Sequence, residues 1–463
     1  MNDDTALTPE LMRLAGVLLL GAIAAILDTT IVAVAIDRLG AELGTTISTI
    51  QWVSTGYLLA LTVAIPLTGW AVGRFGGRRM WLVSLTGFLG GSVLCGFAWS
   101  AESLILFRVV QGLGGGMLLP LMQSILAQAA GPKRIGRAMG IVAIPAQLGP
   151  ILGPVIGGLI IDGASWRWIF FVNVPVCLVA LALAWRWMPD DKDERHATRL
   201  DFAGLALLSP ALAGIVYGLS RAGDAGGFGA SQVLVPLGLG LVLLTVFVVH
   251  ALRTTAVPII DVRLLRVRSF AAASGLMFAL GGSLFGAMFL LPLFEQIARD
   301  RSALEAGLLL APQGAGTMIG LVVAGRLSDR VGPRVLVLVG LALGTLSTIP
   351  YALVDAGTSE VLLGSALYVR GVGLGLAIVP VMSSFYADVP RAAIPGATAS
   401  MRIIQQIGGS LGTAVLAVIL QHALTDAASP TDAFGTTFWW TVGLAGAALV
   451  PALLLPGRRP STE

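Results

Sequence analysis

Charged residues are scarce in this chain of 463 residues: Asp, Glu, Lys and Arg together make up 12% of it, whereas 56% of the residues are hydrophobic. A soluble globular protein carries about 25% charged residues. With half that charge, water cannot solvate the whole surface, so a lipid bilayer must be the solvent for most of the chain. The same composition excludes disordered and collagen-like proteins.

Cysteine is also rare, and the motifs of common enzymes are missing. The two cysteines, Cys95 and Cys177, lie inside apolar runs, so we interpret them as small apolar fillers with no disulfide framework. The sequence has no phosphate-binding Gly-Lys loop, no His/Cys metal spacing and no nucleophile elbow. A net charge of only +4, with basic residues in short scattered clusters, argues against nucleic acid as a partner. We therefore expect no enzyme activity and no cofactor or metal.

What the chain does contain is a series of long apolar runs. Each is bounded by charge, Pro or Gly and is long enough, at about 20 residues, to cross the hydrocarbon core as a helix. The sequence thus predicts an all-α polytopic membrane protein with fourteen transmembrane helices, at 11–36, 50–72, 80–99, 103–128, 136–161, 168–188, 202–220, 232–252, 269–297, 304–325, 335–354, 359–383, 396–421 and 436–456.

The positions of arginine and lysine predict the orientation of these spans. An even number of spans places both termini on one side of the membrane. If that side is the cytoplasm, the outer loops hold only Arg38, Arg167, Arg221, Arg299 and Arg301, and the cytoplasmic loops hold most other basic residues. We therefore predict a multi-pass protein of the cell membrane with both termini in the cytoplasm.

A loop motif that occurs twice indicates an internal repeat. The two copies are Gly69, Gly73, Arg74, Gly76 and Arg78, and Gly325, Asp329, Arg330, Gly332 and Arg334. The residues that we predict to form a cytoplasmic latch are Gly69, Arg74, Gly76, Arg78, Asp329, Arg330 and Arg334. The sequence therefore predicts two similar six-helix halves, at 1–200 and 269–463. Between them, 201–268 holds two inserted helices without a copy of the motif.

Asp28 lies deep in the first predicted span, with about eight residues, or about 12 Å of helix rise, between it and the outer end. A carboxylate at that depth is costly unless it faces a cavity or a partner, and burial favours its protonated form. Asp28 is therefore the first candidate for a proton site. The alternative is a structural ion pair or a helix cap near the outer interface.

Arg108 lies in the fourth predicted span, at a depth similar to that of Asp28 in the first. Arginine keeps its charge, so it can stabilise a neighbouring ionised carboxylate and compete with a proton or a cationic substrate for it. Gln111, one turn further on, can orient the pair. The alternative is an interfacial arginine whose side chain extends outward from the helix end.

Small residues at four-residue spacing follow in the fifth predicted span. Glycines at this spacing permit close helix packing, and prolines bend a helix. The pattern predicts a bent packing helix, with ordinary close packing as the alternative to a hinge; its residues are Pro145, Gly149, Pro150, Gly153, Pro154, Gly157 and Gly158.

Other candidates are less specific. Glu295, at the outer end of the ninth predicted span, is a second carboxylate that can attract cations, although charge is common at an interface. Aromatic residues in membrane helices mostly pack or anchor at interfaces. The candidates for lining a substrate cavity are Thr29, Trp52, Tyr57, Gln111, Phe278, Phe285, Phe294 and Arg370.

These motifs together resemble the fourteen-helix drug:proton antiporters of the major facilitator superfamily, of the quaternary-ammonium and multidrug efflux type. The resemblance rests on 27–32 (Leu-Asp-Thr-Thr-Ile-Val), 51–57, 108–116, 149–158 and 166–175 (Trp-Arg-Trp-Ile-Phe-Phe-Val-Asn-Val-Pro). It implies the major facilitator fold, Asp28 as a protonation or cation site, Arg108 as its proton-relay partner, and 149–158 as a hinge surface between the halves. The chain departs from the family pattern at Gly73, where Asp is usual, at Asp37, where Pro is usual, and at Glu295, where a neutral residue is usual.

The function that the resemblance implies is secondary active efflux of lipophilic, cationic drugs, coupled to proton influx by alternating access. The expected partners are a small-molecule lipophilic substrate, protons and the lipid bilayer, and we expect a monomer. Two alternatives stay open. One is proton-linked transport of another kind, either export of a specific metabolite, lipid or self-made antibiotic or proton-linked uptake; the other is a receptor or membrane partner that does not transport.

Overall fold

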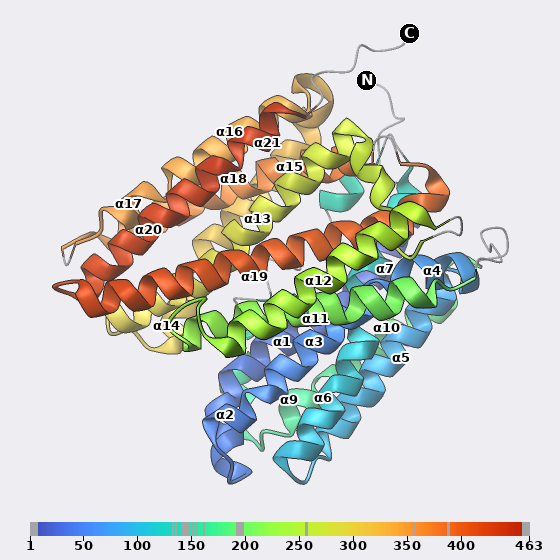
Figure 1. Cartoon of the computed structure of the whole chain (residues 1–463). Helices are drawn as coiled ribbons and strands as arrows, with labels where there is room; N and C mark the ends of the chain where they lie inside the picture. Colours follow the sequence, from blue (N-terminus) through green and yellow to red (C-terminus); the bar gives the residue numbers. More distant parts are fainter. Residues whose placement is uncertain are drawn as a thin grey trace. The chain divides into compact units, whose positions relative to one another are not determined.

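The computed structural model describes residues 8–131, 134, 137–140, 149, 152–153, 156–160, 163–190, 199–254, 258–355, 357–386 and 389–455. In these ranges the chain consists of helices and their connecting turns, and contains no β-strand (Figure 1). The prediction of an all-α protein is therefore confirmed.

The chain divides into two compact units that are not simple halves of the sequence. The first unit comprises Met1–Ala213, Gly240–Asp261 and Pro390–Ile403, and the second comprises Gly214–Leu239, Val262–Val389 and Ile404–Glu463. Three long helices, α11 (Phe202–Asp224), α12 (Ser231–Arg253) and α19 (Ile394–Asp426), contribute residues to both units. The predicted division at 200 and 268 stays a prediction.

The first unit is built from the helices that follow the N-terminus. Thr8 caps the first of them by accepting a hydrogen bond from the Leu11 N–H, and Ser100 and Ser103 form a capping box at another. The helices are α1 (Pro9–Glu42), α2 (Ile47–Ile50), α3 (Trp52–Ala64), α4 (Leu67–Phe75), α5 (Gly77–Gly96), α6 (Ala101–Gly115), α7 (Leu118–Ala130), α9 (Trp168–Phe171), α10 (Asn173–Trp187) and the turn η4 (Arg391–Ala393).

The second unit is built from the helices of the C-terminal part of the chain. They are η2 (Val262–Arg266), α13 (Arg268–Leu293), η3 (Phe294–Ala298), α14 (Ala303–Leu308), α15 (Ala311–Val331), α16 (Pro333–Leu346), α17 (Ile349–Ala352), α18 (Glu360–Tyr386), α20 (Pro430–Ala447) and α21 (Leu449–Leu453).

Most of the predicted spans coincide with helices that can cross a membrane. The described residues hold eleven helices that are long and apolar enough, or twelve if α3 and α4, which meet at 53°, form one bent span. The predicted span 80–99 coincides with α5, whose glycines, serines and N-terminal arginines lower its mean hydropathy. Most of the predicted span 136–161 lies outside the described residues. The number fourteen therefore stays a prediction.

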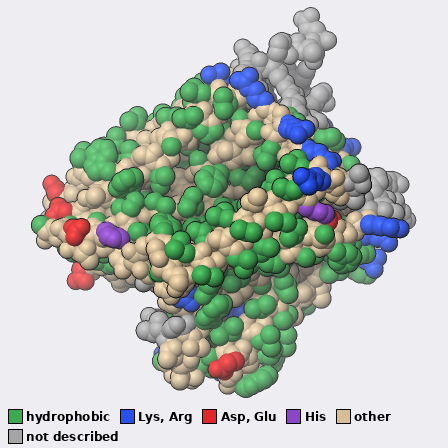
Figure 2. All heavy atoms as spheres, viewed as in Figure 1, with side chains coloured by type: hydrophobic (Ala, Val, Ile, Leu, Met, Phe, Trp, Pro, Cys, Tyr) green, Lys and Arg blue, Asp and Glu red, His purple; other side chains and the backbone are tan. Residues whose placement is uncertain are grey.

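The apolar surface of these helices is the surface that a bilayer would cover. Along α12 only 17% of the most apolar stretch is buried, and Val235 and Val242 are 66% and 59% exposed. Figure 2 shows hydrophobic side chains over most of the visible face, with the charged side chains gathered near helix ends. Such exposed apolar helices are expected in lipid and not in water.

The repeated loop motif has the same backbone conformation in both copies. Gly76, between α4 and α5, has φ +91°, and Gly332, before α16, has φ +88°. Both values lie in the region that glycine adopts without the steric cost of a Cβ atom. The same turn thus ends the loop in each copy, which supports the internal repeat.

Candidate functional site

Asp28 lies in α1 and is completely buried inside the first unit. Its carboxylate accepts hydrogen bonds from three side chains. Arg108 Nη1 donates to Oδ2 in an ion pair, while Gln111 Nε2 and Asn173 Nδ2 donate to Oδ1 at 2.9 and 3.0 Å. Residues from α1, α6 and α10 therefore meet at one buried carboxylate.

Arg108 is held by further contacts that do not involve Asp28. Its Nη1 donates to Gln111 Oε1 at 2.7 Å, and its Nε donates to the Val53 carbonyl oxygen at 3.1 Å. The guanidinium carbon lies 3.8 Å from the centre of the Tyr57 ring, a cation–π contact. These contacts hold the Arg108 side chain in place without depending on the charge of the Asp28 carboxylate.

Gln111 connects the two ions, as the sequence pattern suggested, whereas two other polar residues were not predicted as site residues. Asn173 bonds both Asp28 and Ser92 Oγ, and Ser92 Oγ in turn donates to the Phe170 carbonyl oxygen at 2.9 Å. Asn173 belongs to the motif 166–175, and an amide inside an apolar run is a signal for a buried polar contact. Ser92 carries no such signal in the sequence.

Glycines bring the helices of this site close together. A Cβ atom at Gly112 would lie 2.6 Å from the Tyr57 carbonyl oxygen, and one at Gly91 would overlap the backbone of Gln111. The helices α3 and α5 can therefore approach α6 only because these residues have no side chain. This approach places Tyr57 and Ser92 beside the ion pair.

The described part of the glycine and proline motif packs against α1, next to Asp28. A Cβ atom at Gly149 would overlap Ile26, one at Gly153 would overlap Thr30, and one at Gly157 would lie 3.3 Å from the Ile31 carbonyl oxygen. Gly158 faces open space. Pro145, Pro150 and Pro154 lie outside the described residues, and the hinge role stays a prediction.

This packing gives a direct test of the motif. Gly153→Leu is expected to leave the protein inserted in the membrane but to reduce transport to background, because the added side chain has no room beside Thr30. Gly90→Leu, a control at an exposed glycine of α5 with open space beside it, is expected to transport like the wild type. Transport into inverted vesicles, normalised to the amount of folded protein, measures both; normal transport by Gly153→Leu would remove the functional role of this contact.

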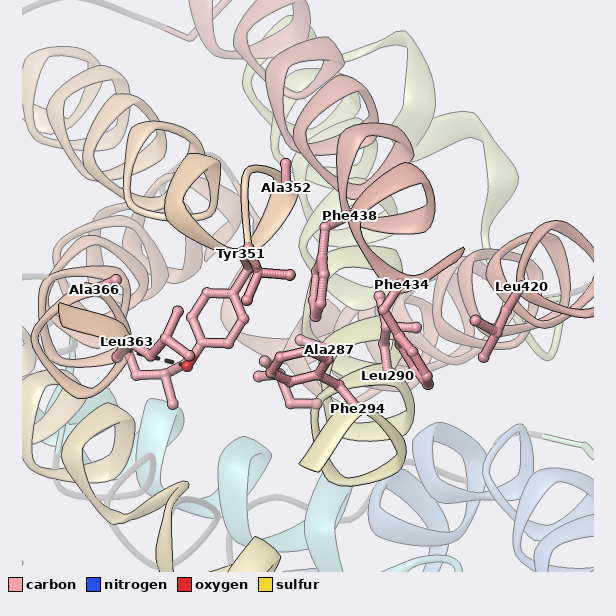
Figure 3. Close-up of a cluster of buried hydrophobic side chains, with 13 residues drawn as sticks. Ala287, Leu290, Phe294, Tyr351, Ala352, Leu363, Ala366, Leu420, Phe434 and Phe438 are labelled. Carbon is pink, nitrogen blue, oxygen red and sulfur yellow. Dashed lines mark hydrogen bonds between the residues drawn. The ribbon is translucent and has the colours of Figure 1, made fainter. Parts of the chain in front are cut away.

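Glu295 lies in the π-helical turn η3 and is buried, with 6% of its surface exposed. Its Oε2 has no hydrogen-bond partner among the described residues. The neighbouring Phe294 is fully buried in an aromatic cluster with Tyr351, Phe434 and Phe438 (Figure 3). In this conformation Phe294 is therefore part of the packed core of the second unit.

The other candidates for a substrate cavity have varied surroundings. Thr29 donates to the carbonyl oxygen of Ile26 at 2.7 Å, Trp52 is half-buried and Phe278 is 38% exposed. A Cβ atom at Gly409 would overlap the Phe285 ring. Arg370 is buried and donates to neutral groups of the second unit. A role for any of these residues in substrate binding stays a prediction.

The latch residues are described only in part. A Cβ atom at Gly69 would lie 2.8 Å from Gly396 Cα, and Arg78 forms an ion pair with Asp190. Arg74 is exposed and Arg334 is half-buried. The side chains of Asp329 and Arg330 lie outside the described residues, and the latch role stays a prediction.

An all-helical chain with eleven or more apolar spans and a buried ion pair inside one helical unit has the architecture of a multi-pass membrane transporter. Residues 18–413 match the Major Facilitator Superfamily, and the chain belongs to this family. Membership of this family indicates a transporter rather than an enzyme.

The chain is similar to several proteins that are named for drug resistance. It is 40% identical over 414 residues to the multidrug resistance protein B homolog of Mycobacterium tuberculosis, covering 89% of this chain and 76% of that protein. It is 30% identical over 448 residues to the tetracenomycin C resistance and export protein of Streptomyces glaucescens, with 94% and 82% covered. It is 29% identical to the lincomycin resistance protein LmrB of Listeria monocytogenes, with 81% and 79% covered.

Solved structures show the same fold at low sequence identity. The human organic anion transporter MFSD10 matches with a TM-score of 0.67 and 17% identity, covering 97% of this chain and all of the other. The proton:xylose symporter XylE matches with a TM-score of 0.65 and 15% identity, covering 95% and 94%. The predicted major facilitator fold is thereby confirmed.

Proposed function

We propose that this protein exports lipophilic, cationic drugs or other toxic compounds across the cell membrane in exchange for protons, by alternating access. The observation that carries the proposal is the ion pair of Asp28 and Arg108, which lies buried in the first unit together with two amide side chains. The names of the similar proteins support drugs as the substrate class. Buried charges inside membrane helices are costly, and they generally serve transport.

Proton coupling follows from competition for one carboxylate. In the described conformation the carboxylate of Asp28 is paired with the guanidinium of Arg108. When a proton or a cationic substrate binds the carboxylate, this ion pair is lost, and Arg108 keeps its contacts with Gln111, Val53 and Tyr57. Because the carboxylate cannot hold a proton and a cation together, binding of one releases the other.

The proton gradient is a sufficient source of energy. One charge that moves down a potential of 100 mV supplies about 2.3 kcal/mol, so one or two protons would drive a useful substrate gradient.

Glu295, the second buried acid, is the next candidate for a coupling residue. We further propose fourteen transmembrane helices, cytoplasmic termini and a monomeric transporter in which the latch and the 149–158 motif serve the conformational change.

A second candidate function is the export of one specific antibiotic. It is favoured by the similarity to the tetracenomycin C resistance and export protein, which extends over 94% of this chain. The two functions differ in specificity and share the coupling mechanism.

A substrate panel in proteoliposomes tests the proposal. With an imposed pH gradient, lipophilic cations are expected to accumulate in the more acidic compartment at several times the level seen after the gradient is collapsed. Protein-free liposomes under the same gradient control for passive distribution. Accumulation of a single compound from the panel would favour the second candidate, and accumulation that is independent of the pH gradient would contradict proton coupling.

A further inference from the structure

Glycine contacts identify equivalent positions in the two units. In the first unit, a Cβ atom at Gly112 would meet the Tyr57 carbonyl oxygen on α3, and one at Gly114 would meet Gly87 and Phe88 on α5. In the second unit, a Cβ atom at Gly371 would meet the Gln313 carbonyl oxygen on α15, and one at Gly373 would meet Gly340 and Gly344 on α16. The helix α18 is therefore the counterpart of α6, packed by glycines in the same order.

This match assigns a counterpart to each residue around Asp28. Gln111 precedes Gly112 and Arg370 precedes Gly371, so Arg370 takes the place of Gln111. Ser92 follows Gly91 on α5 as Thr345 follows Gly344 on α16. Gln111 donates to Asp28 on α1, while Arg370 Nη2 donates to the Ser283 carbonyl oxygen and hydroxyl on α13 at 3.0 and 3.3 Å, so Ser283 takes the place of Asp28.

The counterpart in the second unit has a cation and lacks the acid. Arg370 is 4% exposed, and its described bonds go to the neutral Ser283 and, at 2.6 Å, to Gln313 Oε1. Among the described residues no carboxylate forms an ion pair with it, whereas Arg108 in the first unit pairs with Asp28. A buried guanidinium without a counter-charge is strongly unfavourable, so a negative charge is expected near it.

There is space for such a charge. A cavity of about 20 Å³ lies between α13, α16, α18 and the end of α20, and its lining includes Arg370, Ser283 and Thr345. The Thr345 hydroxyl is buried and has no hydrogen-bond partner in the part of the chain that the structure describes, whereas its counterpart Ser92 is bonded to Asn173. A cavity of this size holds about one water molecule or one ion of similar size.

We propose that this cavity binds a small monovalent anion of halide size, which supplies from solution the negative charge that Asp28 supplies in the first unit. Arg370 provides the charge, and the hydroxyl groups of Ser283 and Thr345 provide hydrogen bonds. The site is distinct from the ion pair proposed for proton coupling, because Asp28 and Arg108 belong to the first unit and all residues of the cavity belong to the second. A drug-sized carboxylate does not fit the cavity.

The test is the halide dependence of thermal stability of the purified full-length protein, at constant ionic strength with gluconate as the replacement anion. A ligand that binds the folded state raises its melting temperature as the ligand concentration rises. The wild type is expected to melt at higher temperature in chloride and bromide than in gluconate, with saturation. Arg370→Gln is expected to lose this dependence, and Arg38→Gln, which changes an arginine with an exposed side chain, is expected to retain it.

A gain-of-charge variant keeps the test decisive if Arg370→Gln does not fold. Ser283→Asp places a carboxylate where the anion is proposed, so it is expected to raise the melting temperature in gluconate and to remove the effect of chloride. Equal melting temperatures of the wild type in chloride, bromide and gluconate would mean that the cavity holds only water. That result, or an unchanged halide effect in Arg370→Gln or Ser283→Asp, would overturn the proposal.

Discussion

Asp28→Asn is expected to abolish efflux against a concentration gradient while the protein still folds and inserts. The substitution removes the charge with little change in volume, and the amide can still bond with the neighbouring side chains Gln111 and Asn173. Without a carboxylate, no proton can be exchanged for substrate at this position. Accumulation in proteoliposomes with an imposed pH gradient is therefore expected to fall to the level of protein-free liposomes.

Exchange in the absence of a gradient separates coupling from binding. Substrate exchange involves no net movement of protons, so neutral substrates are expected to exchange in Asp28→Asn at close to the wild-type rate. Cations that bind the carboxylate directly are expected to bind more weakly. The matched control is Glu42→Gln, which removes an exposed acid from the same helix and should leave efflux unchanged. Gradient-driven efflux by Asp28→Asn at the wild-type level would place coupling elsewhere, with Glu295 as the next residue to test.

Arg108→Gln is expected to be strongly destabilising. It leaves the buried Asp28 carboxylate without its ionic partner, and breaking a buried ion pair by removing one partner costs about 3–5 kcal/mol. The double variant Asp28→Asn with Arg108→Gln removes both charges and is expected to recover much of the lost stability. The two substitutions are then strongly non-additive, as is usual for residues in direct contact.

Thermal unfolding of the purified variants in one detergent measures this coupling. The control is Arg38→Gln, which breaks an exposed ion pair with Glu42 and is expected to change stability by about 1 kcal/mol or less. If the two buried single variants and the double variant follow simple addition, Asp28 and Arg108 do not form a functional ion pair in the membrane.

The sequence was most informative where a single charged residue stands inside an apolar run. A carboxylate at position 28 and a guanidinium at position 108 stand inside apolar runs, and the structure brings both together with Gln111. Asn173 and Ser92 were missed as site residues because the contact between them depends on how α5 and α10 pack, which local sequence patterns do not specify. The glycines that permit close packing were visible, but their partners on other helices were not.

The second unit shows the same limit more clearly. Phe294 was a candidate for lining a cavity, whereas in the described conformation it packs on Tyr351, Phe434 and Phe438 from distant parts of the chain. Arg370 was predicted to face a substrate cavity, and the cavity that it does line is too small for a drug. The repeat in the sequence was found from the loops alone; the correspondence between α6 and α18 became visible only through their glycine contacts.

Release of protons on addition of substrate tests the central claim most directly. Purified wild-type protein in weakly buffered detergent solution, with a pH-sensitive dye, is expected to release protons when a lipophilic cation is added, because the cation displaces the proton from those molecules in which Asp28 is protonated. Asp28→Asn is expected to release none under the same conditions, while Glu42→Gln releases as many as the wild type. Equal proton release by the wild type and Asp28→Asn would contradict the assignment of Asp28 as the coupling residue.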